Sequence, residues 1–189
     1  MNSYRFNRGY VPLAYVPSGE NGEIELIDVT ILVTDASLTI PDDILTVVNS
    51  FWDATRPDYP PFLVIAKNFT DKILEQLVGM NAQGLPIFAV KAPAYGDRQK
   101  EMLIDIATVT GGVIFPGKPD VEGGRIDAGV LGRAKLVRLS AEETYIDGGA
   151  GDEEPVRQRI AQIRHEIETT YSDFDREKLQ ERLDVLMGK

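Results

Sequence analysis

Short apolar runs alternate with longer amphipathic stretches along most of this chain. Each run is bounded by turn residues or by an amphipathic stretch, as buried strands are, and the runs cover residues 31–33, 62–66, 86–90, 113–115 and 135–139. Between them, helical windows open at Pro41, Thr70 and Asp97, and the third ends at Gly111. Strands interleaved with helices predict an α/β fold.

The two ends of the chain differ from this middle part. The first thirty residues are irregular to extended, and only residues 23–26 alternate as a half-buried strand does. Near the C-terminus, a helix that starts at Pro155 places its apolar residues on one stripe. A second helix starts after Ser172, so we expect two antiparallel helices joined by a short turn.

The helical window 41–52 carries more apolar surface than one buried face requires. Four residues form the stripe that a surface helix needs to reach its core, namely Ile44, Val47, Val48 and Phe51. Leu45 and Trp52 widen this apolar arc to roughly 160°, against about 100° for one buried face. The window therefore predicts an apolar edge in addition to its core face.

The window 70–79 repeats the pattern, with Ile73 and Leu77 as its core stripe and Leu74 and Val78 on one flank. We therefore expect an exposed groove between the two helices that binds an apolar peptide by burial. Its predicted lining residues are Leu45, Val48, Trp52, Leu74 and Val78. The alternative is that another subunit, or simply a deeper core, covers these edges.

Composition narrows the classes of function. The chain has 189 residues with 30 acidic and 20 basic side chains, and its net charge of −10 opposes binding to nucleic-acid phosphate or anionic lipid. Cys is absent and His occurs once, so the sequence predicts neither a metal site nor a bound cofactor. Without a signal-peptide core or an apolar run of ~20 residues, we expect a soluble, cytoplasmic protein with no membrane contact.

One long stretch has a specific likeness to a known family. Residues 90–112 read VKAPAYGDRQKEMLIDIATVTGG and closely resemble the apical domain of GroEL-type (group I) chaperonins. The resemblance recurs in residues 8–10, 159–164 and 172–183, in the family's order and at near-family spacing. It covers almost the whole chain, from about residue 4 to residue 187.

The resemblance implies a swivelling β/β/α fold, in which helices flank a β-sandwich core and a helical pair ends the chain. Residues 1–189 would form one polypeptide-binding domain, whereas the equatorial ATPase and intermediate domains of such a chaperonin are absent. The partners implied are non-native polypeptides and the mobile loop of a co-chaperonin. ATP and Mg²⁺ would act in the absent ATPase domain of a ring-forming parent, and the isolated fragment would be a monomer without a cofactor or catalysis.

The binding residues that the resemblance implies lie on two helices and one extended segment. By position they fall on Leu45 and Val48, on Leu74, Leu77 and Val78, and on Tyr10 and Tyr15. The sequence departs from the family at Ala14, Asn49 and Gly79, and residues 55–60 form a longer linker than usual. These departures indicate a divergent member of the family.

Two other readings stay open. A structural module would have its apolar flank covered by a neighbouring domain. An enzyme would use carboxylates such as Asp97 and Asp105 on a small substrate, and it would hold a perturbed acid pair inside a concave pocket. Independently of that role, we expect Asp97 to cap the helix that it opens.

Overall fold

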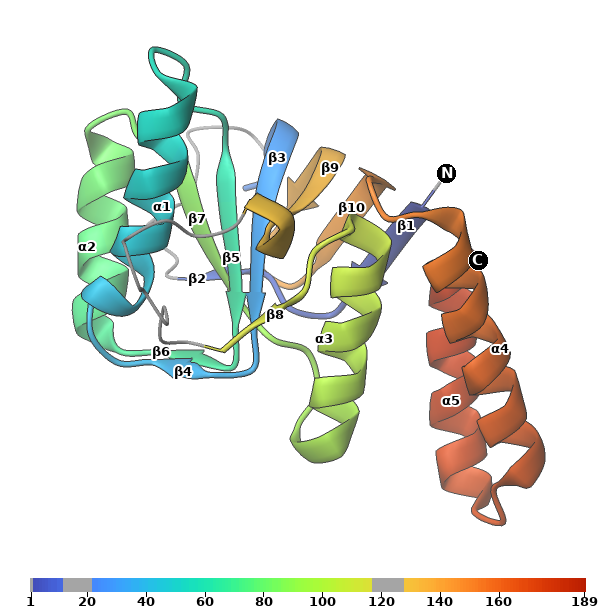
Figure 1. The fold of residues 1–189 in the computed structure, drawn as a ribbon. Coiled ribbons are helices and arrows are strands. Elements are labelled where there is room, and N and C mark those ends of the chain that lie inside the picture. The colour runs from blue at the N-terminus through green and yellow to red at the C-terminus, as the bar shows by residue number, and fades with distance from the viewer. Residues whose placement is uncertain (1, 12–21, 117–127) are drawn as a thin grey trace.

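The computed structural model of the chain describes residues 2–11, 22–116 and 128–189. Over these residues the protein is mixed α/β, with an eight-stranded sheet, a two-stranded sheet and five α-helices (Figure 1). The α/β class predicted from the alternation of apolar runs and helical windows is therefore confirmed.

The large sheet has parallel strands at one end and antiparallel strands at the other. Its order is β1 (Asn2–Phe6), β10 (Thr144–Gly149), β9 (Gly132–Leu139), β3 (Ile24–Thr34), β5 (Phe62–Ala66), β7 (Ile87–Lys91) and β2 (Tyr10–Val11), and β8 (Ile114–Phe115) also pairs with β3. Strands β3, β5, β7 and β8 are parallel, and the other pairings are antiparallel. A small parallel sheet joins β4 (Ser37–Leu38) to β6 (Asn68–Phe69).

The large sheet is strongly curled. Its two edge strands, β1 and β2, follow one another in the chain, so Phe6 and Tyr10 can be no more than about 14 Å apart. A flat path of seven strands would separate its edges by about 29 Å. The connection crosses the end of the β9–β10 hairpin, where the Tyr10 amide donates to the Ser140 carbonyl at 3.0 Å.

The five described helices cover parts of this sheet and leave one face of its antiparallel strands exposed. Helices α1 (Asp42–Thr55) and α2 (Asp71–Ala82) lie side by side at one end of the molecule, and α3 (Gly96–Thr110) lies between them and the C-terminal hairpin (Figure 1). That hairpin consists of α4 (Glu153–Thr169) and α5 (Asp173–Leu186), which confirms the predicted helical pair. A 3₁₀ turn covers Ala128–Val130.

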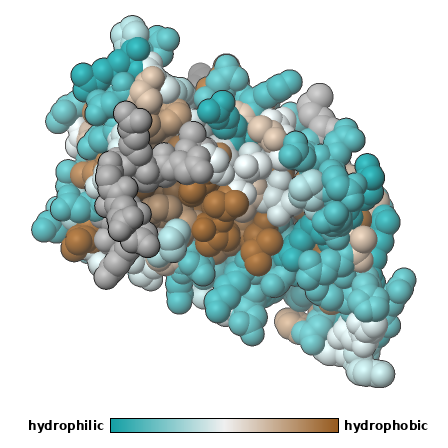
Figure 2. Space-filling view, in the orientation of Figure 1, coloured by the Kyte–Doolittle hydropathy of each residue, from teal (hydrophilic) through white to brown (hydrophobic). Residues whose placement is uncertain are grey.

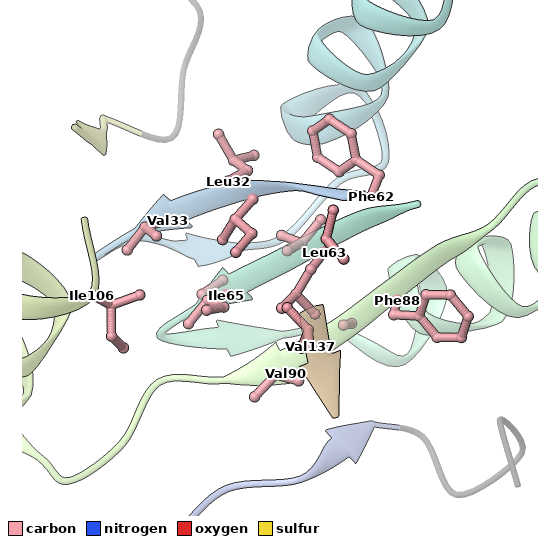
Figure 3. Close-up of a cluster of buried hydrophobic side chains, with 14 of the residues drawn as sticks. Leu32, Val33, Phe62, Leu63, Ile65, Phe88, Val90, Ile106 and Val137 are labelled. Atoms are coloured by element: carbon pink, nitrogen blue, oxygen red, sulfur yellow. The ribbon is translucent and has the colours of Figure 1, made fainter. Parts of the chain in front are cut away.

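The core follows from the parallel strands. All five residues of β5 are fully buried, as are Ile31, Leu32 and Val33 of β3 to within 1%. Such continuous burial means that these strands are covered on both faces, which is typical of parallel strands between helices. Figure 3 shows side chains from β3, β5, β7, β9 and α3 that converge on this core.

Candidate functional site

The first helix of the predicted groove buries a wide face. Ile44, Val47 and Val48 of α1 are each 0% exposed, because the helix lays this stripe on the sheet. Leu45, one position away from the stripe, is half-buried and packs against the edge of the core. Asn49 is exposed on the same helix.

The second helix has a narrower buried stripe. Ile73 and Leu77 of α2 are each 1% exposed, as the predicted core stripe requires. Leu74 and Val78 are half-buried and pack against the core from the flank. A Cβ atom placed on Gly79 would meet nothing within 4 Å, so this side of the helix is open.

The prediction that Val48, Trp52, Leu77 and Tyr10 line an exposed surface is wrong, because each of them is at most 3% exposed within this chain. Val48 and Leu77 belong to the core stripes of their helices. Tyr10 lies in β2 beside β7, and its hydroxyl donates to the Gly22 carbonyl at 3.0 Å.

Trp52 is buried by the linker that follows α1. Its indole Nε1 donates to the Pro60 carbonyl at 3.2 Å. The ring makes edge-to-face contacts with Tyr59 and Phe62, with ring centroids 5.8 and 6.5 Å apart. The linker after α1 therefore buries Trp52, which helical periodicity alone predicts to be exposed.

Three predicted site residues remain partly open, namely Leu45, Leu74 and Val78, and we call them the α1–α2 edge. All three are half-buried side chains that pack against the core. In the face shown by Figure 2, the surface over α1 and α2 is mainly hydrophilic with small hydrophobic areas. Tyr15 and Ala14 lie outside the described residues.

A buried ion cluster that no sequence motif reveals joins three helices and β1. The Asp105 carboxylate of α3 is 0% exposed and accepts from Arg159 Nε of α4 at 2.6 Å and from Arg182 Nε of α5 at 2.9 Å. The Tyr4 hydroxyl of β1 donates to the same carboxylate at 3.3 Å. Glu101 adds a second carboxylate on Arg159.

The cluster shifts the titration of its members. Burial, and next the negative charge of Asp105, raises the pKa of the Tyr4 phenol well above its usual value. Burial by itself would lower the pKa of the Arg159 guanidinium, but the attraction of Asp105 and Glu101 outweighs it and raises that pKa. The Arg159 guanidinium therefore stays charged, and the Tyr4 phenol stays neutral.

The two carboxylates named for an enzyme are far apart. Asp97 and Asp105 are eight residues apart on α3, which separates them by about 12 Å along the helix axis. Asp105 is held by two arginines, whereas Asp97 is exposed beside a cleft of about 410 Å³ between α3 and the α4–α5 hairpin. They do not form the acid pair that this reading requires.

Asp97 is also not the cap of α3. The N-cap position is Tyr95, no side chain caps the helix there, and Asp97 lies in the first turn. A carboxylate in that turn still interacts favourably with the helix dipole.

No protein-family model matches the chain. Across the described ranges, no three or more His, Asp or Glu side chains are grouped so as to hold a metal ion. None of the helices that the structure describes is long and apolar enough to cross a membrane.

Proposed function

We propose that this chain is a polypeptide-binding domain of the chaperonin apical type, which captures exposed apolar segments of non-native proteins. The observation that carries the proposal is the α1–α2 edge, where Leu45, Leu74 and Val78 from two neighbouring helices stay partly open to solvent. The resemblance of residues 90–112, 159–164 and 172–183 to the family supports the same reading. In this proposal the curled sheet with its flanking helices is the apical-domain fold.

The edge would bind by burial, without catalysis. Completing the burial of three half-buried aliphatic side chains contributes roughly 1 kcal/mol each, and the covered peptide contributes a similar amount. Part of this gain is lost in ordering the peptide. A single domain should therefore bind weakly, with a Kd on the order of 1 mM.

Several copies held together would bind more tightly. One unfolded chain can contact several edges at once, and each later contact then forms at a high effective concentration. This is the arrangement that a ring-forming chaperonin parent would supply, with a co-chaperonin loop competing for the same edge. Release would be driven by ATP in domains that these residues do not include.

The experiment measures the binding of an immobilised, chemically unfolded protein to the wild-type domain and to Leu45→Glu and Leu74→Glu variants. Both substitutions place a charge where the apolar segment would lie, and both should reduce binding at least fivefold. Ile27→Glu is the matched control, because Ile27 is 63% exposed on β3, away from the edge. Equal binding by all four proteins would contradict the proposal, and so would loss of binding in the Ile27 variant alone.

A further inference from the structure

A second cavity lies on the sheet, where α1 stops covering it. It has a volume of about 530 Å³ and is bounded by β3, β9, β10, the last turn of α1 and the linker before β5. Phe51 of α1 and Pro60 of the linker form its apolar wall. Arg133 and Lys135 of β9 form its charged wall.

The register of the sheet shows how the charged wall is built. A Cβ atom on Gly149 would overlap the Val109 carbonyl oxygen of α3, so this side of Gly149 faces α3. Ala134 is paired with Gly149, and its side chain therefore lies on the same face of the sheet. Arg133 and Lys135 flank Ala134 on β9 and therefore point to the opposite face, toward the cavity. Both are exposed, and their Cα atoms are about 7 Å apart.

The position of Lys135 is set by its neighbour on β10. Gly148 lies beside Lys135 in the register, and a Cβ atom on Gly148 would lie 2.8 Å from the Lys135 Cβ. The absence of a side chain at Gly148 thus leaves room for the aliphatic stem of Lys135. On the other side, Asp28 of β3 lies opposite Lys135 with a positive φ of 55°, which few L residues other than Asn and Asp adopt.

The charges of the cavity wall are unbalanced over its described lining residues. Neither Arg133 nor Lys135 forms an ion pair with a described residue, although the chain has a net charge of −10. Asp28 lines the same cavity without forming an ion pair with Lys135. The charged wall therefore has an excess of one positive charge beside an apolar wall.

We infer that this cavity binds a small organic anion with an apolar body, such as an aromatic carboxylate or sulfonate. The anionic group lies between Arg133 and Lys135, where hydrogen bonds to charged groups are stronger than neutral ones. The apolar body packs against Phe51 and Pro60. This site is separate from the α1–α2 edge and does not depend on the proposed polypeptide binding.

The test uses 8-anilinonaphthalene-1-sulfonate as the probe, titrated into the ¹⁵N-labelled chain. Backbone amide shifts identify the site, and they should appear at Gly148, Gly149 and Ala150. The double variant Arg133→Ser/Lys135→Ser should raise the Kd for these shifts at least about tenfold. Arg138→Ser is the matched control, because Arg138 lies on the same strand but is paired with Glu25 at 3.1 Å.

A variant that binds more tightly than wild type cannot be explained by a loss of structure, and Asp28→Asn is expected to be such a variant. Asp28→Asn removes the one carboxylate among the described lining residues of the cavity and keeps a residue that tolerates the positive φ. It should lower the Kd about threefold or more. The inference is overturned if the amide shifts fall only on α1 and α2, or if the double variant and Asp28→Asn both bind like wild type. Shifts that persist in Leu45→Glu separate this site from the edge.

Discussion

Replacing Asp105 by Asn should destabilise the protein more than any exposed charge change. The substitution keeps the shape of the side chain but removes the charge that holds Arg159 and Arg182, whose side chains are 8% and 5% exposed. Breaking a buried pair by removing one partner costs about 3–5 kcal/mol, because the remaining charge is left without compensation. Here two guanidinium groups lose their shared acceptor, although Glu101 keeps a contact with each.

This loss can be measured by urea unfolding. With a slope of about 2–3 kcal/mol/M, a loss of 3–5 kcal/mol lowers the midpoint by about 1–2.5 M. Glu25→Gln is the control, because it breaks an exposed pair with Arg138 and should cost less than about 1 kcal/mol. If Asp105→Asn costs no more than Glu25→Gln, the cluster does not hold the helices as argued.

A triple variant separates charge from packing. Asp105→Asn combined with Arg159→Met and Arg182→Leu leaves no unpaired buried charge at these three positions. It should recover part of the stability that Asp105→Asn alone loses, since apolar replacements of buried ion clusters are often neutral or stabilising. A triple variant less stable than Asp105→Asn would show that the arginines contribute mainly by other contacts.

Three further predictions follow from single residues. Gly79→Ala should stabilise the protein by about 0.5–1 kcal/mol in thermal unfolding, because Gly79 is in a helix with open space at its Cβ position. Gly79→Val should strengthen polypeptide binding, because it extends the α1–α2 edge. Ala94→Gly should stabilise by about 1 kcal/mol, because Ala94 has a φ of 57° that costs less for glycine; an equal or lower urea midpoint would contradict this. The pKa of the Tyr4 phenol is raised in the folded state, so the phenol contributes its full stabilisation below about pH 10. Above about pH 10 the phenol ionises in the unfolded chain first, and this stabilisation is lost. The stability of Tyr4→Phe should therefore fall less steeply between about pH 10 and 11 than that of the wild type.

The buried parallel strands and all five helices could be predicted because their patterns are local. An apolar run such as that of β5 indicates burial on both faces wherever it lies. Strands β1 and β10 were not predicted. The first begins with two polar residues and has only Tyr4 and Phe6 as apolar positions, too few to show an alternation. The second ends in Gly148 and Gly149, which indicate a turn in sequence but allow close approaches in the sheet.

The candidate site was predicted only in part, for a physical reason. Helical periodicity gives the width of an apolar arc but not what covers it, so Leu45 and Trp52 look equivalent in sequence. The linker after α1 then buries Trp52 and leaves Leu45 half-open. The Asp105 cluster was missed because a carboxylate on a helix usually indicates a solvent face, and its partners are 54 and 77 residues away.

The most direct measurement is paramagnetic broadening by a spin-labelled, unstructured apolar peptide, read on the methyl groups of the chain. The account predicts broadening at Leu45, Leu74 and Val78, with the exposed methyls of Ile27 and Val113 unaffected. Broadening centred on Ile27 or Val113, or none at peptide concentrations of several millimolar, would contradict the claim that the α1–α2 edge binds polypeptide.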